Sequence, residues 1–104
     1  MLSIYKTTEQ GLEKLDMIAN GAWVNVVDPT PEEMEKLVTW GMDMDYINYA
    51  LDQDEMARME RDEDYTFILL RIPMHQPESD VPFNTVPLGI MILGNKIITV
   101  CRYN

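Results

Sequence analysis

The stretch TVPLGIMILGNKIITVC, residues 85–101, decides the fold class of this chain. It holds two apolar runs that only Gly94-Asn95 separates. Two such residues between apolar runs predict a tight β-hairpin turn. Upstream, Tyr65–Ile72 is apolar on both faces in its middle, which is typical of a strand inside a sheet. The C-terminal part of the chain is therefore expected to form several neighbouring strands.

The N-terminal part of the chain carries shorter runs of the same kind. Leu2–Thr7 alternates enough to form a short strand, and Ala22–Val27 is rich in β-branched and aromatic residues. Gly11–Ile18 fits either a strand or a helical turn. The position of Trp23 in its strand predicts a buried ring, whose replacement by alanine would then cost about 3–5 kcal/mol of folding free energy.

Helix signals lie between these two groups of strands. Thr30-Pro31-Glu32-Glu33 places a hydroxyl at the N-cap, proline at the first helical position and glutamate three residues after the cap, which is a capping box. We expect one helix from Pro31 to Trp40 and a second that begins near Asp43 or Asp45. The order of elements predicts a single α/β domain over residues 1–104, in which helices pack on a mixed β-sheet.

One segment shows no periodicity. Met74–Phe83 contains prolines between polar residues, and such a composition is typical of a loop. We expect it to be the most mobile part of the chain.

Charge and composition narrow the classes of function. The 104 residues include 8 Lys and Arg against 18 Asp and Glu, which gives a net charge of −10. Binding to nucleic acid needs Lys and Arg that displace counterions from phosphates, so nucleic acid is not an expected partner. Cations and basic proteins suit an acidic surface. The longest apolar run, Leu88–Leu93, is far shorter than the roughly 20 residues of a membrane-spanning helix.

Two residues could carry enzyme chemistry, and each has a plainer interpretation. His75, the single histidine, could shuttle protons, but an exposed histidine in a loop is the more common case. Cys101, the single cysteine, has no evident activating partner, which favours a buried and inert thiol in a reducing cytoplasm. No glycine-rich phosphate loop, paired Cys-x-x-Cys or nucleophile elbow occurs. We predict that the chain is not an enzyme and uses no organic cofactor.

Acidic residues concentrate in positions 43–64, which hold nine of the 18 in the chain. Within this segment, Asp52, Asp54 and Glu55 are candidate ligands for a hard cation such as Mg²⁺, which prefers carboxylate oxygens. If the segment is helical, Asp52 and Glu55 share a face while Asp54 points away. Two carboxylates on one face would suffice for a weak, largely hydrated site. The alternative is a solvated acidic rim that binds nothing.

A longer pattern resembles a known family. The run WVNVVDPTPEE, residues 23–33, resembles the opening of the cytosolic domain in CorA-type magnesium and cobalt transport proteins. The resemblance continues through Arg58 and Glu60 into FILLRI, residues 67–72, and ends in the hairpin PLGIMILGNKIITV, residues 87–100. It covers about residues 22–101 in the right order and spacing. Each motif alone is weak, and their collinear order carries the resemblance.

The resemblance implies a location and a role. It implies the N-terminal part of a longer membrane protein, lying on the cytoplasmic side of the cell membrane, whose C-terminal helices form the pore. It also implies a homopentamer in which Mg²⁺ between neighbouring cytosolic domains favours the closed state. The domain would then sense divalent cations without transporting them. By itself, this piece is expected to be a monomer or a weak dimer.

One departure from the family concerns the metal site. Where members carry adjacent acidic residues on the second helix, this chain has Asn48-Tyr49. Asp52, Asp54 and Glu55, one turn further along, are the substitute prediction. The alternative function is a free-standing acidic adaptor that docks a basic protein through its helices, with a resemblance that reflects the fold only.

Overall fold

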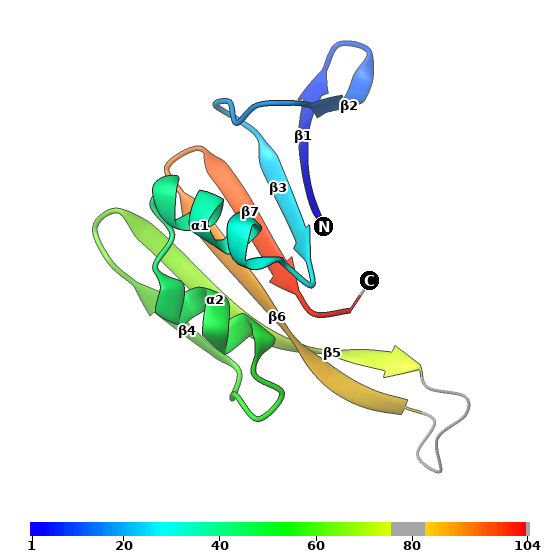
Figure 1. Cartoon of the computed structure of the whole chain (residues 1–104), viewed down its shortest axis with the longest axis vertical. Helices are drawn as coiled ribbons and strands as arrows, with labels where there is room; N and C mark the ends of the chain where they lie inside the picture. The colour runs from blue at the N-terminus through cyan, green and yellow to red at the C-terminus, as the bar shows by residue number, and fades with distance from the viewer. Residues whose placement is uncertain (76–82, 104) are drawn as a thin grey trace.

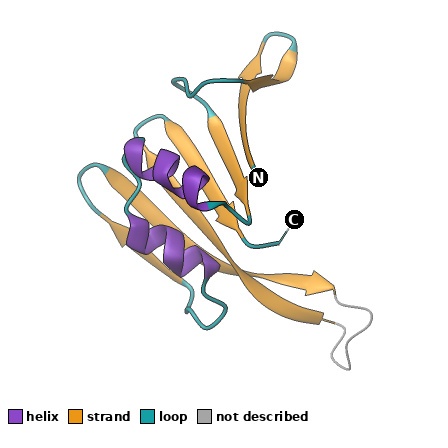
Figure 2. Ribbon diagram, viewed as in Figure 1, coloured by secondary structure: helices purple, strands orange, loops and turns teal. Residues whose placement is uncertain are grey.

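The computed structural model describes residues 1–75 and 83–103, which form one seven-stranded sheet with two helices on one of its faces (Figures 1 and 2). The mixed α/β architecture expected from the sequence is confirmed. The described elements are, in chain order, β1 (Leu2–Thr8), β2 (Gly11–Leu15), β3 (Trp23–Val27), α1 (Pro31–Thr39), α2 (Met44–Leu51), β4 (Arg58–Arg61), β5 (Tyr65–His75), β6 (Phe83–Leu93) and β7 (Lys96–Cys101).

The strands lie in the order β2-β1-β3-β7-β6-β5-β4. The central pair, β3 and β7, is parallel, and every other neighbouring pair is antiparallel. Parallel neighbours need a crossover connection, and α1 and α2 lie in the stretch of chain between β3 and β7. Across the predicted hairpin turn, Leu93 pairs with Lys96, and Gly94 adopts a positive φ of 58°, which glycine tolerates at little cost.

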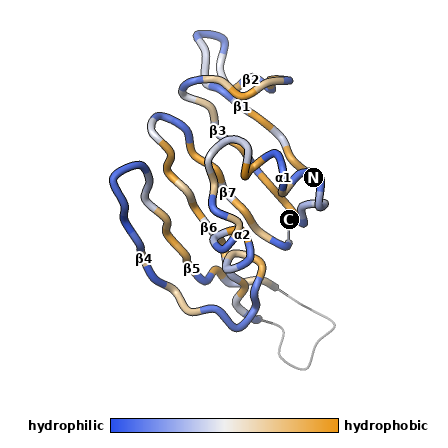
Figure 3. The backbone as a smooth tube through the Cα atoms, turned by 60° about the vertical axis from the view of Figure 1, so that its left-hand side comes forward, coloured by the Kyte–Doolittle hydropathy of each residue, from blue (hydrophilic) through white to orange (hydrophobic). Residues whose placement is uncertain are grey.

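The hydrophobic core lies between the sheet and the helices. On β3, Val24 and Val26 are fully buried. They share the face of the sheet that the helices cover, because alternate side chains of a strand point to the same face. Figure 3 shows hydrophobic residues along the neighbouring strands β5, β6 and β7. The remaining buried members of the core are Ile4, Ala22, Leu37, Met42, Ile47, Ala50, Phe67, Leu69, Met91, Ile98 and Val100.

The start of α1 is a complete capping box, as the sequence predicts. The Thr30 hydroxyl accepts a hydrogen bond from the Glu33 N–H at 3.2 Å, and the Glu33 carboxylate accepts one from the Thr30 N–H at 3.0 Å. The same carboxylate also accepts from the Met1 ammonium at 3.1 Å. Burial alone would raise the pKa of Glu33, but these donors outweigh it and hold the pKa below its ordinary value.

Thr30→Ala is expected to cost about 1 kcal/mol of unfolding free energy, because it leaves the Glu33 N–H without its side-chain acceptor. Urea denaturation followed by circular dichroism measures this loss. Thr30→Ser is the matched control, since it keeps the hydroxyl and should remain within about 0.5 kcal/mol of the parent. Equal stability of the alanine and serine variants would show that the cap does not hold this helix end.

Trp23 is not buried, and the prediction for its ring is wrong. The residue is 37% exposed on the face of the sheet opposite the helices. Its indole N–H donates to the Thr99 hydroxyl at 2.9 Å, and its ring centroid lies 5.3 Å from that of Tyr5. Because Val24 and Val26 occupy the helix side, alternation directs Trp23 away from the core. The cost of 3–5 kcal/mol, which assumed a buried ring, therefore does not apply.

The structure resolves one open strand assignment and adds one strand. Gly11–Ile18, which fits either a strand or a helical turn by sequence, contains the strand β2, which pairs with β1. The acidic segment contains β4, which the sequence analysis did not predict. It is a short, charged edge strand that pairs only with β5 among the described strands, a composition that protects a sheet edge from further pairing.

The predicted loop Met74–Phe83 is too long at both ends. β5 continues to His75 and β6 begins at Phe83, and these two residues are paired across the ladder. Pairing between two long strands overrides the weak local signal there. Residues 76–82, and with them the prediction of mobility, lie outside the described residues.

Candidate functional site

The three predicted metal ligands lie in the loop of residues 52–57, which connects α2 to β4 and is called here the acidic loop. Asp52 is the C-cap of α2, so the helix ends before the three acids. The Asp52 carboxylate accepts a hydrogen bond from the Asp54 N–H at 3.0 Å. Asp52 and Asp54 are exposed, whereas Glu55 is half-buried. The helical spacing that would put Asp52 and Glu55 on one face is therefore absent from this loop.

Glu55 already has an internal cation as its partner. Its carboxylate forms an ion pair with the guanidinium of Arg58, which also lies 3.3 Å from the Glu60 carboxylate. The hydrogen bond with Glu55 is the main reason that the pKa of Arg58 is raised above its ordinary value. This pairing neutralises much of the Glu55 charge, so Glu55 is less available to a metal than the two exposed aspartates.

Arg58 also contacts Tyr49, one of the two residues that stand where family members carry adjacent acidic residues. Its guanidinium carbon is 4.6 Å from the centroid of the Tyr49 ring, a cation–π contact. Asn48, the neighbouring residue on α2, is exposed. At these two positions α2 therefore presents the Asn48 amide and the Tyr49 ring, which is in contact with Arg58. An acidic pair at the same positions would present two carboxylates to a cation.

A second arginine fixes the acidic loop to the sheet. One Arg71 nitrogen donates to the carbonyl oxygens of Gln53 and Glu55, both at 2.9 Å. Its other nitrogens donate to the Thr85 hydroxyl and carbonyl, also at 2.9 Å. The Gln53 side-chain amide donates to the same Thr85 carbonyl at 2.7 Å. The sequence analysis missed this role, although an arginine within an apolar strand is a signal that its five donors must find acceptors.

An aromatic cluster lies under α2, next to Arg58. The Tyr46 and Tyr65 hydroxyls are 2.8 Å apart, and the Tyr46 ring stacks on Phe67 with centroids 4.4 Å apart. The hydrogen bond with Tyr65, together with burial, raises the pKa of Tyr46. The Tyr46 phenol therefore stays protonated at neutral pH and is not available as a base or nucleophile. The role of the cluster is to pack α2 against β5.

The remaining candidates lie outside this region or outside the described side chains. Cys101 is buried, as predicted, with its sulfur 3.6 Å from the Pro87 carbonyl oxygen. His75 ends β5, and its side chain lies outside the described part of the structure. Within that part, no three His, Cys, Asp or Glu side chains gather into a group that could hold a metal ion. The metal role of Asp52, Asp54 and Glu55 stays a prediction.

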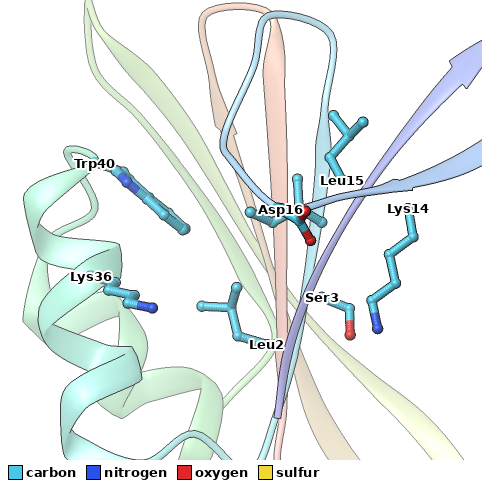
Figure 4. A pocket seen from close by; sticks show the side chains of 8 residues that line it. Leu2, Ser3, Lys14, Leu15, Asp16, Lys36 and Trp40 are labelled. Carbon is cyan, nitrogen blue, oxygen red and sulfur yellow. The ribbon is translucent and has the colours of Figure 1, made fainter.

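A pocket of about 370 Å³ lies between α1 and the β1–β2 hairpin. Figure 4 shows Trp40 and Lys36 on one side of it, with Leu2, Leu15 and Lys14 on the other. Two lysines against the single Asp16 make this pocket unfavourable for a cation. It lies at the β2 end of the sheet, whereas the acidic loop precedes β4 at the opposite end.

Comparisons with known proteins agree with the fold. Residues 19–104 match the model of a family described as CorA-like Mg²⁺ transporter protein. The cobalt/magnesium transport protein CorA of Methanocaldococcus jannaschii is 34% identical over 79 residues, which cover 75% of this chain and 24% of that protein.

Two solved structures from the same organism match the whole chain. The complete structure of the CorA magnesium transporter is 28% identical with a TM-score of 0.81, and the match covers 33% of it. The structure of the soluble domain of CorA is 29% identical with a TM-score of 0.80, and the match covers 41% of it. The chain thus spans about a quarter of the curated relative and a third of the complete structure. Among the described residues, no helix is long and apolar enough to cross a membrane.

Proposed function

Because this chain belongs to the CorA-like Mg²⁺ transporter protein family, we propose that it is a cytosolic, cation-sensing regulatory domain and that it does not transport ions by itself. The observation that carries the proposal is the match of the whole chain to the soluble domain of CorA, at a TM-score of 0.80. The relatives named above are transport proteins, which also favours a role other than catalysis.

The proposed mechanism is linkage between cation binding and the state of an assembly. In a homopentamer on the cytoplasmic side of the membrane, an ion that binds the closed arrangement better than the open one shifts the population by that difference in affinity. Mg²⁺ and Co²⁺ are the ions that the names of the relatives indicate. The ion would be the signal as well as the cargo of the complete protein.

The acidic loop is the proposed point of contact for the ion. Asp52 and Asp54 are exposed, and hydrated Mg²⁺ keeps several waters while it binds one or two carboxylates. Glu55 would join only if it left Arg58. Because Arg71 ties the loop backbone to β5 and β6, a change at this loop would be transmitted to the sheet.

Mg²⁺ is expected to raise the thermal stability of the chain beyond the effect of charge screening. At a concentration ten times the dissociation constant, a ligand that binds only the folded state adds about 1.4 kcal/mol. Thermal unfolding in MgCl₂ and in NaCl of equal ionic strength separates the two effects, since any salt screens a net charge of −10.

Two variants locate the effect. Asp52→Asn should remove most of the extra stabilisation by Mg²⁺. Glu35→Gln removes an equal charge from an exposed position on α1 and should leave it unchanged. If MgCl₂ stabilises the parent no more than matched NaCl does, the acidic loop of this chain is not an ion sensor.

A further inference from the structure

Arg58 is the first residue of β4, directly after the acidic loop that connects this strand to α2 (Figure 1). Its guanidinium contacts three parts of the structure at once. It forms ion pairs with the carboxylates of Glu55 in the loop and Glu60 on β4, and it lies over the Tyr49 ring of α2. The Arg58 side chain is only 29% exposed. Arg58 is therefore a cation that the fold holds in place beside the acidic loop.

The neighbouring arginines differ from Arg58 in what they bind. Arg71 donates to backbone carbonyls of the acidic loop and to Thr85, and all of these acceptors are uncharged. Arg61, at the other end of β4, is exposed and forms no ion pair within residues 1–75 and 83–103. Of the arginines on β4 and β5, Arg58 is thus the one that neutralises a carboxylate of the loop.

A carboxylate that pairs with an arginine is a poor ligand for a metal ion. Mg²⁺ binds through carboxylate oxygens, so it has to displace the guanidinium from Glu55 or bind beside it against charge repulsion. Arg58 lies three residues from Glu55 on the same chain. A competitor tethered over so short a distance acts at an effective concentration in the millimolar range or above. A free cation therefore meets this carboxylate already occupied.

The two aspartates of the loop are free of this competitor. Asp52 and Asp54 are exposed, and neither forms an ion pair with a basic side chain in the part of the chain that the structure describes. One Asp52 oxygen accepts the Asp54 N–H, which leaves the other oxygen available to a ligand. The loop thus has two accessible carboxylates and a third that Arg58 holds back.

We propose that Arg58 sets the affinity of the acidic loop for divalent cations by competing with them for Glu55. With Arg58 in place, an ion meets only the two aspartates and binds weakly. Without it, Glu55 joins them. The inference rests on the proposed function, in which a hydrated divalent cation is the ligand of this loop. It adds the residue that limits the affinity, and with it the ion concentration at which the domain responds.

Thermal unfolding in a series of MgCl₂ concentrations, each compared with NaCl of equal ionic strength, gives the Mg²⁺ dissociation constant of each variant. Arg58→Gln should lower this constant by roughly fivefold or more, because it removes the competing charge and frees Glu55. Arg61→Gln is the matched control, since it removes an equal charge from the far end of β4. It should change the constant by less than about twofold in 0.15 M salt, which screens charges beyond about 8 Å. Circular dichroism confirms that each variant is folded.

A double variant tests whether the gain depends on Glu55. Arg58→Gln combined with Glu55→Gln keeps the net charge of the parent, but it lacks the carboxylate that Arg58 holds back. Its dissociation constant should return to within about twofold of the parent value, because the two residues act through one contact. Glu55→Gln alone leaves Arg58 in place, so it should weaken Mg²⁺ binding much less than Asp52→Asn does. This last comparison does not depend on the folding of any Arg58 variant.

The outcomes separate this inference from the proposed function. If Mg²⁺ stabilises Arg58→Gln but not the parent, Arg58 competes as proposed and the parent loop is not an ion sensor. If Mg²⁺ stabilises the parent and Arg58→Gln binds it no more tightly than Arg61→Gln does, the inference about Arg58 is wrong and the loop remains a sensor. A gain that persists in the double variant, or a loss in Glu55→Gln as large as that in Asp52→Asn, also contradicts the inference. If neither the parent nor Arg58→Gln binds Mg²⁺, both are wrong.

Discussion

Replacing Phe67 with alanine is expected to destabilise the domain by about 3–5 kcal/mol. Phe67 is fully buried on β5, on the helix side of the sheet, where its ring stacks on Tyr46 of α2. Its removal leaves a cavity that the sheet and helix cannot fill, and it takes away the contact that orients Tyr46. Domains of this size are stable by about 5–15 kcal/mol, so urea denaturation should show a large shift of the midpoint.

Leu70→Ala on the same strand is the control. Leu70 is 42% exposed on the face of the sheet opposite the helices, so its truncation should cost less than about 1 kcal/mol. Similar losses for the two variants would mean that the core does not lie on the helix side of β5.

The hairpin and α1 could be predicted because their signals are local. Gly94-Asn95 between apolar runs and the box from Thr30 to Glu33 each specify a conformation through neighbouring residues alone. The face of the sheet on which the Trp23 side chain lies could not be predicted in this way. An aromatic residue in a strand shows that the side chain fits a pleated surface. Which face of that strand is buried depends on the side of the sheet that the helices cover.

The candidate site was less predictable, because it depends on where a helix ends and on contacts distant in sequence. The shared face of Asp52 and Glu55 required a helix through both residues, but α2 ends at Leu51. The loop conformation is set instead by Arg71, which is 16 residues from Glu55. The family resemblance indicated the correct fold and class of protein, while it could not supply ligands at positions where this chain differs.

Gly89→Ala is expected to destabilise the domain by about 2–3 kcal/mol through overpacking. In a strand, alanine is otherwise favoured over glycine by roughly 0.5–1 kcal/mol, so the expected sign depends on the space available. A Cβ added at Gly89 would lie 2.6 Å from the Cβ of Ala50 and 3.3 Å from the Phe67 ring. Neither atom belongs to the free end of a flexible side chain, so α2 would have to move away from β6.

A double-mutant cycle with Ala50→Gly tests this explanation. Ala50→Gly alone should cost about 1 kcal/mol, the penalty of glycine within a helix. It also removes the atom that a Cβ at position 89 would meet. The double variant should therefore be more stable than the sum of the single losses predicts, by about 1–2 kcal/mol, which is a coupling typical of residues in contact. Additive losses would show that the close approach of α2 to β6 at Gly89 does not limit the packing, whereas positive coupling would establish Gly89 as the position that allows α2, and with it the acidic loop, to lie against the sheet.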